Sequence, residues 1–212
     1  MKTTARTALV VAVGALHILL TGCDTGQPPQ RSTESRQTEP PYVAAYKAGH
    51  QAGKSLYDAG GKGAAVREEV WGGCTRRALD AGSPESEADR GAWVQGCLDG
   101  VSNKPIAAPK ATVTSRTEDT GLLRSFRTWA ENHGSQGSVR HVSQLSTAQL
   151  TQRDYDVELT TDYTGANEMQ ARELARDFVM WWDSDHGVNE DSTARNVLIL
   201  GHDGKMLVNE RI

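Results

Sequence analysis

The chain has 212 residues, a hydrophobic fraction of 37% and only two phenylalanines, so it can bury one or two small cores but not one large core. Residues 1–22 hold two basic and no acidic side chains, and the remaining 190 residues hold 21 basic and 27 acidic ones, a net charge near −6. This charge argues against nucleic-acid binding, which needs a basic surface.

The first segment has the layout of a secretory signal peptide. Lys2 and Arg6 give it a basic start, and an apolar run of thirteen residues follows at 8–20. A membrane-spanning helix needs about 20 apolar residues, so a retained helix is the weaker interpretation. The run passes directly into Leu20-Thr21-Gly22-Cys23.

The motif Leu20-Thr21-Gly22-Cys23 resembles the lipobox of bacterial lipoprotein precursors. The resemblance implies that residues 1–22 are removed, that Cys23 carries the lipid, and that the protein is attached to the extracytoplasmic side of the cell membrane. An ordinary cleaved signal peptide is the alternative. The glycine-, alanine- and arginine-rich composition suggests an actinobacterial source.

Residues 23–41 are predicted to form a disordered tether. From residue 24 onward this segment has four prolines and no aliphatic or aromatic side chain, so it cannot offset the entropy cost of ordering. A flexible chain of eighteen such residues has a root-mean-square end-to-end distance of roughly 25 Å.

Residues 42–102 are predicted to form a small helical module. A first helix spans 43–57, and its Gly49 and Gly53 share one face, where they allow a neighbouring backbone to approach closely. Gly60-Gly61-Lys62-Gly63 is expected to end it. A second helix, at 64–81, places four residues inward at every fourth position: Val66, Val70, Cys74 and Ala78. A third helix is expected to start at Ser83-Pro84-Glu85 and to carry Ala92, Trp93 and Cys97 inward.

Cys74 and Cys97 are the two thiols left once Cys23 carries a lipid. In an exported protein they are predicted to form a disulfide, which would join the second helix to the third. They enclose 22 residues, and closing a loop of that size contributes on the order of 3 kcal/mol to stability. A zinc site would need two further ligands at a recognisable spacing, and the sequence near them has none.

A linker at 103–110 leads to an α+β module at 111–212. Helices are predicted at 118–133 and 167–183, and strands at 139–145, 155–163, 196–200 and 206–212, the last two forming a hairpin. The order is helix, strand, strand, twice. We therefore expect a four-stranded antiparallel sheet with two helices on one face, and Val113 could add a strand.

The strand at 155–163 alternates between apolar and acidic side chains. Its acidic face holds Asp154, Asp156, Glu158 and Asp162. The simplest interpretation is a solvated face balanced by Arg140 and Arg195 on neighbouring strands. The functional interpretation is a docking surface for a basic partner.

The histidines and the loop after residue 182 offer little chemistry. His133 and His186 each precede a glycine at a helix end, where an imidazole caps the helix. The sequence Asp183-Ser184-Asp185 resembles the opening of a calcium loop, with Asp191 as a further oxygen ligand. It departs from the EF-hand pattern at Gly187, Val188 and Ala194, so a solvated acidic loop is the default.

We predict no catalytic residue, metal centre or cofactor, because no nucleophile motif, phosphate-binding loop or zinc pattern is present in the sequence. The leading hypothesis is a lipid-anchored protein that presents a non-enzymatic binding domain to an envelope protein or glycan. The alternative is an envelope hydrolase in which acids such as Asp162 and Asp183 converge. A hydrolase should show a concave pocket with paired acids or a histidine–acid contact, and a binding domain a flat or grooved patch.

Overall fold

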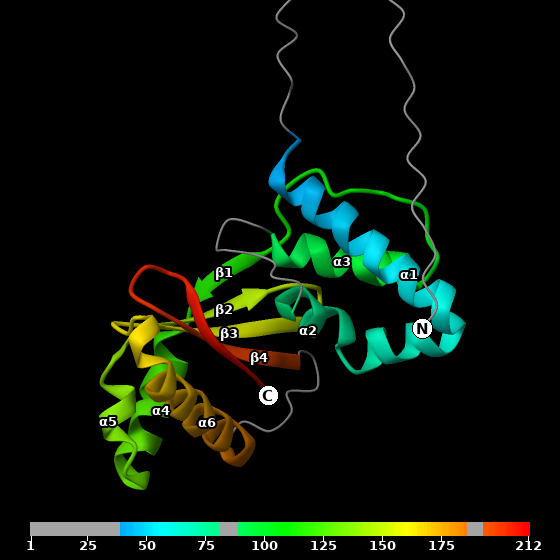
Figure 1. Cartoon of the computed structure of the whole chain (residues 1–212). Coiled ribbons are helices and arrows are strands. Elements are labelled where there is room, and N and C mark those ends of the chain that lie inside the picture. Colours follow the sequence, from blue (N-terminus) through cyan, green and yellow to red (C-terminus); the bar gives the residue numbers. More distant parts are fainter. Residues whose placement is uncertain (1–38, 81–88, 186–192) are drawn as a thin grey trace, which may run out of the picture. The chain divides into compact units, whose positions relative to one another are not determined.

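The computed structural model describes residues 39–80, 89–185 and 193–212. The predicted leader, the lipobox, nearly all of the tether, the helix start at Ser83 and the loop at 186–192 lie outside these residues. The described part is α+β, with six α-helices, one 3₁₀ helix and one five-stranded mixed sheet (Figure 1). No helix within it is both long and apolar enough to cross a membrane.

The first helix is longer than predicted. Helix α1 runs from Pro41–Val70, and Gly61, with φ 55° and ψ −145°, kinks it where the sequence predicted an end. Trp71 and Gly72 separate α1 from α2 (Gly73–Asp80), and Gly72 has a positive φ of 65°. The single helix predicted over 64–81 is therefore wrong.

Two side chains predicted to face inward on that helix do not. Val66 is 55% exposed and Val70 is 60% exposed, because the break before Gly73 rotates α2 away from the last turns of α1. Cys74 and Ala78, beyond the break, are buried as predicted.

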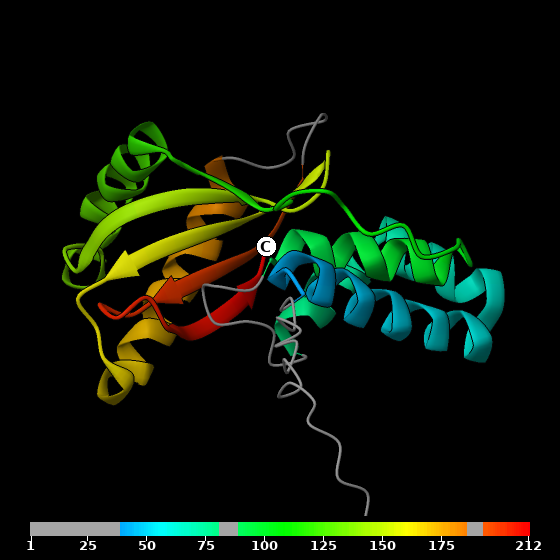
Figure 2. The same cartoon turned by 90° about the horizontal axis from the view of Figure 1, so that it is seen from above.

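Helices α1 and α3 (Arg90–Val101) pack with their backbones nearly touching (Figure 2). A Cβ added at Gly49 would lie 2.0 Å from the carbonyl oxygen of Trp93, and one at Gly53 would lie 2.1 Å from that of Cys97. Gly96 and Gly100 on α3 likewise leave room for the backbone of α1. The close approach predicted from the glycines of α1 is confirmed.

Helix α3 begins at Arg90, directly after the first described residue of this segment. Its N-cap is Asp89, whose Oδ1 accepts hydrogen bonds from the amides of Ala92 (3.1 Å) and Thr114 (2.8 Å). Burial of Asp89 raises its pKa, but the bonds from Thr114, Val113 and Ala92 outweigh it, so the pKa is lowered. One carboxylate thus caps α3 and fixes the chain that leads into the sheet.

The predicted disulfide between Cys74 and Cys97 is present. It joins α2 to α3 with the two Cα atoms 5.9 Å apart, and both cysteines are buried in a cluster with Tyr46, Ala78 and Trp93. The bond therefore closes the core of the helical layer, which is too small to bury much apolar surface.

Removing this disulfide should destabilise the protein. Replacing Cys74 and Cys97 together by alanine is expected to lower the free energy of unfolding by about 3 kcal/mol, since the unfolded chain regains the freedom of a closed loop. Urea unfolding measures the loss. A reducing agent should lower the midpoint of the parent protein and leave that of the variant in place, and equal midpoints for parent and variant would contradict the prediction.

The sheet is mixed, with strands in the order β1-β2-β3-β4-β5. The strands are β1 (Ser115–Glu118), β2 (Val142–Gln149), β3 (Asp154–Thr161), β4 (Thr193–Leu200) and β5 (Met206–Arg211). All neighbours are antiparallel except β3 and β4, which are parallel. The prediction of a four-stranded antiparallel sheet is thus corrected in two ways. A fifth strand, β1, follows Val113. Strands β3 and β4 are parallel, because the helix between them returns the chain to the end of the sheet where β3 began.

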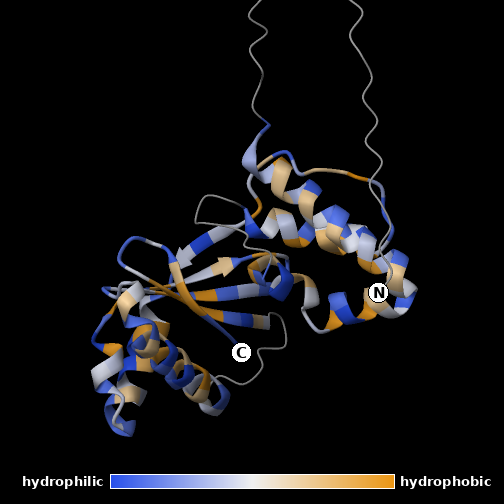
Figure 3. Ribbon diagram, viewed as in Figure 1, coloured by the Kyte–Doolittle hydropathy of each residue, from blue (hydrophilic) through white to orange (hydrophobic). Residues whose placement is uncertain are grey.

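The remaining helices are α4 (Thr120–His133), α5 (Gln136–Val139), the 3₁₀ helix η1 (Gly165–Asn167) and α6 (Glu168–Asp185). Helix α5 and a turn occupy the start of the strand predicted at 139–145, so β2 begins later. Helices α4 and α6 cover one face of the sheet, as predicted (Figure 1). The core between them includes Phe126, Leu159, Phe178 and Trp181. Figure 3 shows the hydrophobic residues of the central strands.

Candidate functional site

The acidic side chains of β3 do not form a solvated face. Asp156 is fully buried and Glu158 is 4% exposed. The alternation itself is correct, because Val157 and Leu159 lie in the core under α4 and α6. The opposite face is covered by the start of α3, which brings Arg90 onto the two carboxylates. The prediction of a wet face is therefore wrong at its centre.

Glu158 is held by two arginines. Arg90 Nη2 donates to Glu158 Oε1 at 2.6 Å, and Arg116 Nε donates to Oε2 at 2.8 Å. Burial raises the pKa of Glu158, but the Arg116 hydrogen bonds and the Arg90 charge outweigh burial and lower it. The pair between Arg90 and Glu158 is an ion pair inside the protein that joins the helical layer to the sheet.

Asp156 is less well compensated. Its Oδ1 accepts a hydrogen bond from Asn196 Nδ2 at 2.8 Å, and its Oδ2 lies 3.5 Å from Arg90 Nη2. Burial raises the pKa of this carboxyl to about 6, more than the Arg90 charge and the Asn196 hydrogen bond lower it. Glu158 adds to the rise by repulsion.

Stability should therefore fall as pH rises through the titration of Asp156. An acid with a raised pKa binds its proton more tightly in the folded state, so between pH 3.8 and about 6 the protein loses up to about 3 kcal/mol as the carboxyl ionises. In Asp156→Asn this loss should be absent. Glu158 and Asp89, whose pKa values are lowered, act in the opposite direction and add stability as pH rises to about 4.5. The comparison is therefore read above pH 5, where both carboxyls are ionised in the folded and the unfolded protein. Parallel stability curves between pH 5 and 7, measured by urea unfolding, would refute the assignment.

Arginines gather where β4 begins and β5 ends. They line a pocket of about 210 Å³ and come from α1, α2, β4 and β5: Arg67, Arg76, Arg77, Arg195 and Arg211. We call this the arginine pocket. Glu68 and Trp71 lie in its wall.

Two of the five guanidinium groups are neutralised. Arg77 donates to both carboxylate oxygens of Glu68 (3.1 and 3.2 Å), and Arg195 Nε donates to Asp154 at 2.7 Å. The other three, on Arg67, Arg76 and Arg211, are exposed and have no side-chain partner within the described part of the chain. The pocket thus holds an excess of positive charge on a protein whose net charge is negative.

The break between α1 and α2 shapes this pocket. A Cβ at Gly72 would lie 2.9 Å from Arg195 Cδ, so glycine leaves room for that side chain. Gly73 and Thr75, in the first turn of α2, also line the pocket. The first amides of a helix carry partial positive charge, which adds to that of the arginines. The arrangement suits an anion.

The arginine pocket was not predicted from the sequence. Arg67, Arg76 and Arg77 were part of a predicted amphipathic helix, and Arg195 was expected only to balance the acidic strand, which it does at Asp154. Arg140 does not balance that strand, since its Nε donates to His141 Nε2 at 3.2 Å. The one available signal was the number of arginines around Trp71.

A second recess contains a histidine–acid contact. It measures about 600 Å³ and lies beside α5 and the end of β3. His141 Nδ1 lies 2.8 Å from Asp162 Oδ1, and Asp162 is the outer member of the predicted acidic face. Asp183, the other acid of the hydrolase hypothesis, does not line this recess.

Two serines of this recess, Ser135 and Ser138, act to lower the pKa of Asp177, but burial raises that pKa by more. Within the described residues, no hydroxyl or thiol is hydrogen-bonded to His141, and its Nε2 is occupied by Arg140. A serine nucleophile activated by His141 is therefore not assembled here.

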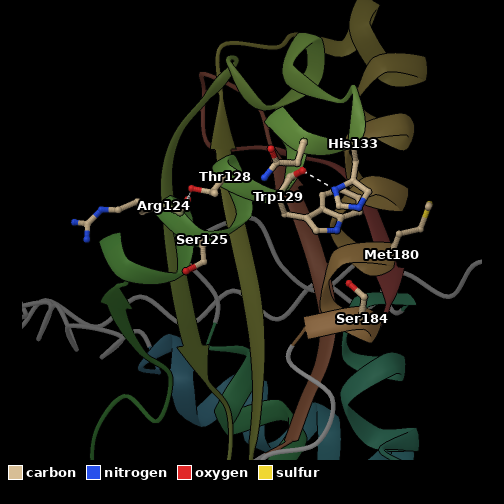
Figure 4. Close-up of a pocket in the computed structure, with 8 residues that line it drawn as sticks. Arg124, Ser125, Thr128, Trp129, His133, Met180 and Ser184 are labelled. Atoms are coloured by element: carbon tan, nitrogen blue, oxygen red, sulfur yellow. Dashed lines mark hydrogen bonds between the residues drawn. The ribbon is translucent and has the colours of Figure 1, made fainter.

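A groove of about 720 Å³ separates α4 from α6. Figure 4 shows Trp129 and His133 side by side, with Met180 and Ser184 facing them from α6 and Arg124 pointing away. The His133 ring stacks on Trp129 at 4.4 Å, and its Nδ1 lies 2.8 Å from the Trp129 carbonyl oxygen. Gly134 follows in the left-handed conformation, so His133 closes the helix as the sequence predicted.

Among the described residues, only one group of side chains brings three possible metal-ligand atoms close together, and this group is buried. Glu68, Cys74 and Cys97 place ligand atoms within 4.8 Å of one another, but the cysteines are bonded to each other and Glu68 is bonded to Arg77. In the candidate calcium loop, Asp183 is exposed near the end of α6, and Asp191 lies outside the described residues together with the side chain of Asp185.

No protein-family model, curated protein or solved structure matches this chain.

Proposed function

We propose that this chain is a lipid-anchored protein of the bacterial cell envelope, and that its folded body is a non-enzymatic binding domain for an anionic partner. The arginine pocket carries the proposal. Three exposed guanidinium groups, from α1, α2 and β5, have no acidic partner within the described residues and offer charge and hydrogen-bond donors to phosphate or carboxylate groups.

Binding is better supported than hydrolysis. The contact between His141 and Asp162 lies in a polar recess, which a hydrolase needs, but within the described residues no hydroxyl or thiol is hydrogen-bonded to His141, whose Nε2 accepts from Arg140. In the arginine pocket no general base accompanies the donors, because Glu68 is bonded by Arg77. The anchor itself is supported by the lipobox resemblance at Cys23.

A binding assay with a simple anion tests the pocket. The protein is the chain without residues 1–22 and with Cys23→Ser, and the probe is inorganic pyrophosphate, titrated by calorimetry. At ten times its dissociation constant, pyrophosphate should stabilise the fold by about 1.4 kcal/mol. Replacing Arg67, Arg76 and Arg211 by glutamine should abolish the heat of binding. The same triple change at Arg124, Arg172 and Arg176, exposed arginines of α4 and α6, is the control.

The anchor is tested separately. In a bacterial host, Cys23→Ser should remove the full-length protein from the membrane fraction and stop the shift in mass that lipidation and cleavage produce. A Cys23→Ser protein that remains with the membrane after correct trimming would disprove lipid anchoring at this residue.

A further inference from the structure

We propose that the arginine pocket and the exposed apolar side chains at the end of α1 form a membrane-docking surface for anionic phospholipid headgroups. This deepens the binding role proposed above by naming the source of the anion. The docking surface consists of Trp71 and three arginines that line the pocket, Arg67, Arg76 and Arg211, together with Val66 and Val70, which are exposed on the last turns of α1.

The apolar part of the docking surface is exposed. Val66, Val70 and Trp71 are 55%, 60% and 63% exposed, so three large apolar side chains close together in sequence face solvent. Val66 and Val70 are four residues apart on the last turns of α1 and so share one face. Trp71 lies in the wall of the arginine pocket. Figure 3 shows hydrophobic and hydrophilic residues alternating along this part of α1.

The neighbouring acids do not cancel the positive charge. Glu68 is 4% exposed and bonded by Arg77. Glu69 keeps its charge, since its hydrogen bond comes from the neutral Ser102 hydroxyl at 2.6 Å, but it lines a different pocket. Within the described residues, the exposed charged groups of the arginine pocket that have no side-chain partner are therefore the guanidinium groups of Arg67, Arg76 and Arg211.

This combination matches a membrane surface better than a soluble anion. A soluble phosphate needs the donors of the pocket but gains nothing from exposed valines. At a bilayer, an indole and aliphatic side chains enter the headgroup boundary while arginines bind the phosphates. Each basic side chain near an anionic surface also contributes to attraction.

The predicted tether is long enough for this contact. The first part of α1, from Pro41 to the kink at Gly61, measures roughly 30 Å at 1.5 Å per residue. Eighteen tether residues extend to roughly 60 Å at most. The docking surface can therefore reach the bilayer that holds Cys23.

Vesicle cosedimentation of the unlipidated Cys23→Ser chain without residues 1–22 tests the inference. We expect binding to vesicles of equal parts phosphatidylglycerol and phosphatidylcholine, weakening as salt is added, and none to phosphatidylcholine alone. Replacing the three docking arginines by glutamine should lower the affinity on the order of a hundred-fold. Trp71→Ser should weaken binding as well, whereas Ile106→Ser, at an equally exposed apolar residue of the linker, should not.

The outcomes separate this inference from the binding role. Equal binding to both vesicle types, or equal loss in the control triple at Arg124, Arg172 and Arg176, would overturn docking. Pyrophosphate binding that depends on the arginine pocket without any vesicle binding would also overturn docking but leave the anion-binding role intact. If neither pyrophosphate nor vesicles bind, both proposals are wrong. Circular dichroism of each variant verifies that it is folded.

Discussion

Glu158→Gln lowers the free energy of unfolding at pH 7 by about 3–5 kcal/mol, the cost of breaking a buried ion pair by removing one partner. Glu158 is 4% exposed and Arg90 is 5% exposed. The substitution leaves the Arg90 guanidinium buried with only Asp156, at 3.5 Å, to compensate its charge. Urea unfolding at pH 7 measures the loss.

The matched control is Glu118→Gln, which removes the same charge from exposed strand β1 and should change stability by less than about 0.5 kcal/mol. Glu158→Gln should also lower the pKa of Asp156, because a repelling charge is removed while Arg90 remains. A loss in Glu158→Gln no larger than that of the control would show that the ion pair does not hold the layers together.

Gly96→Ala is expected to destabilise the protein by about 3 kcal/mol or more. A methyl group at Gly96 would lie 2.0 Å from the carbonyl oxygen of Tyr46, a backbone atom that cannot move aside without separating α1 from α3. Separation would also disturb Cys97, one residue further along α3, and thus the disulfide to α2. Thermal and urea unfolding measure the effect.

Gly63→Ala supplies the control on the same layer. Nothing lies within 4 Å of a Cβ at Gly63, and the residue is exposed in the helical part after the kink. Because alanine favours helix, the variant should be as stable as the parent or more stable by up to about 1 kcal/mol. If Gly96→Ala behaves like Gly63→Ala, the close helix contact is wrong.

Local features of the fold were predictable because they depend on a few neighbouring residues. Gly49 and Gly53 at helical spacing indicated a close helix contact, and the two cysteines in an exported chain indicated their bond. Gly134 indicated the end of α4. Pairing of β3 with β4 was not predictable in the same way, since it depends on where α6 returns the chain.

Most of the candidate site could not be predicted either, because it also depends on contacts between residues far apart in sequence. Period-two alternation correctly separated Val157 from Asp156, but it cannot say what covers the second face of a sheet, and here α3 covers it. The arginine pocket combines Arg76 with Arg195 and Arg211, which both lie more than a hundred residues further along the sequence than Arg76. Only the fold brings them together.

The first strand of the sheet bears on how copies of the protein behave when they are crowded. Strand β1 lies at an open edge, is four residues long and exposed throughout, and carries Arg116 and Glu118. A short, charged border offers a neighbouring chain little to extend. Crowded copies of this protein should therefore not join to one another through strand β1.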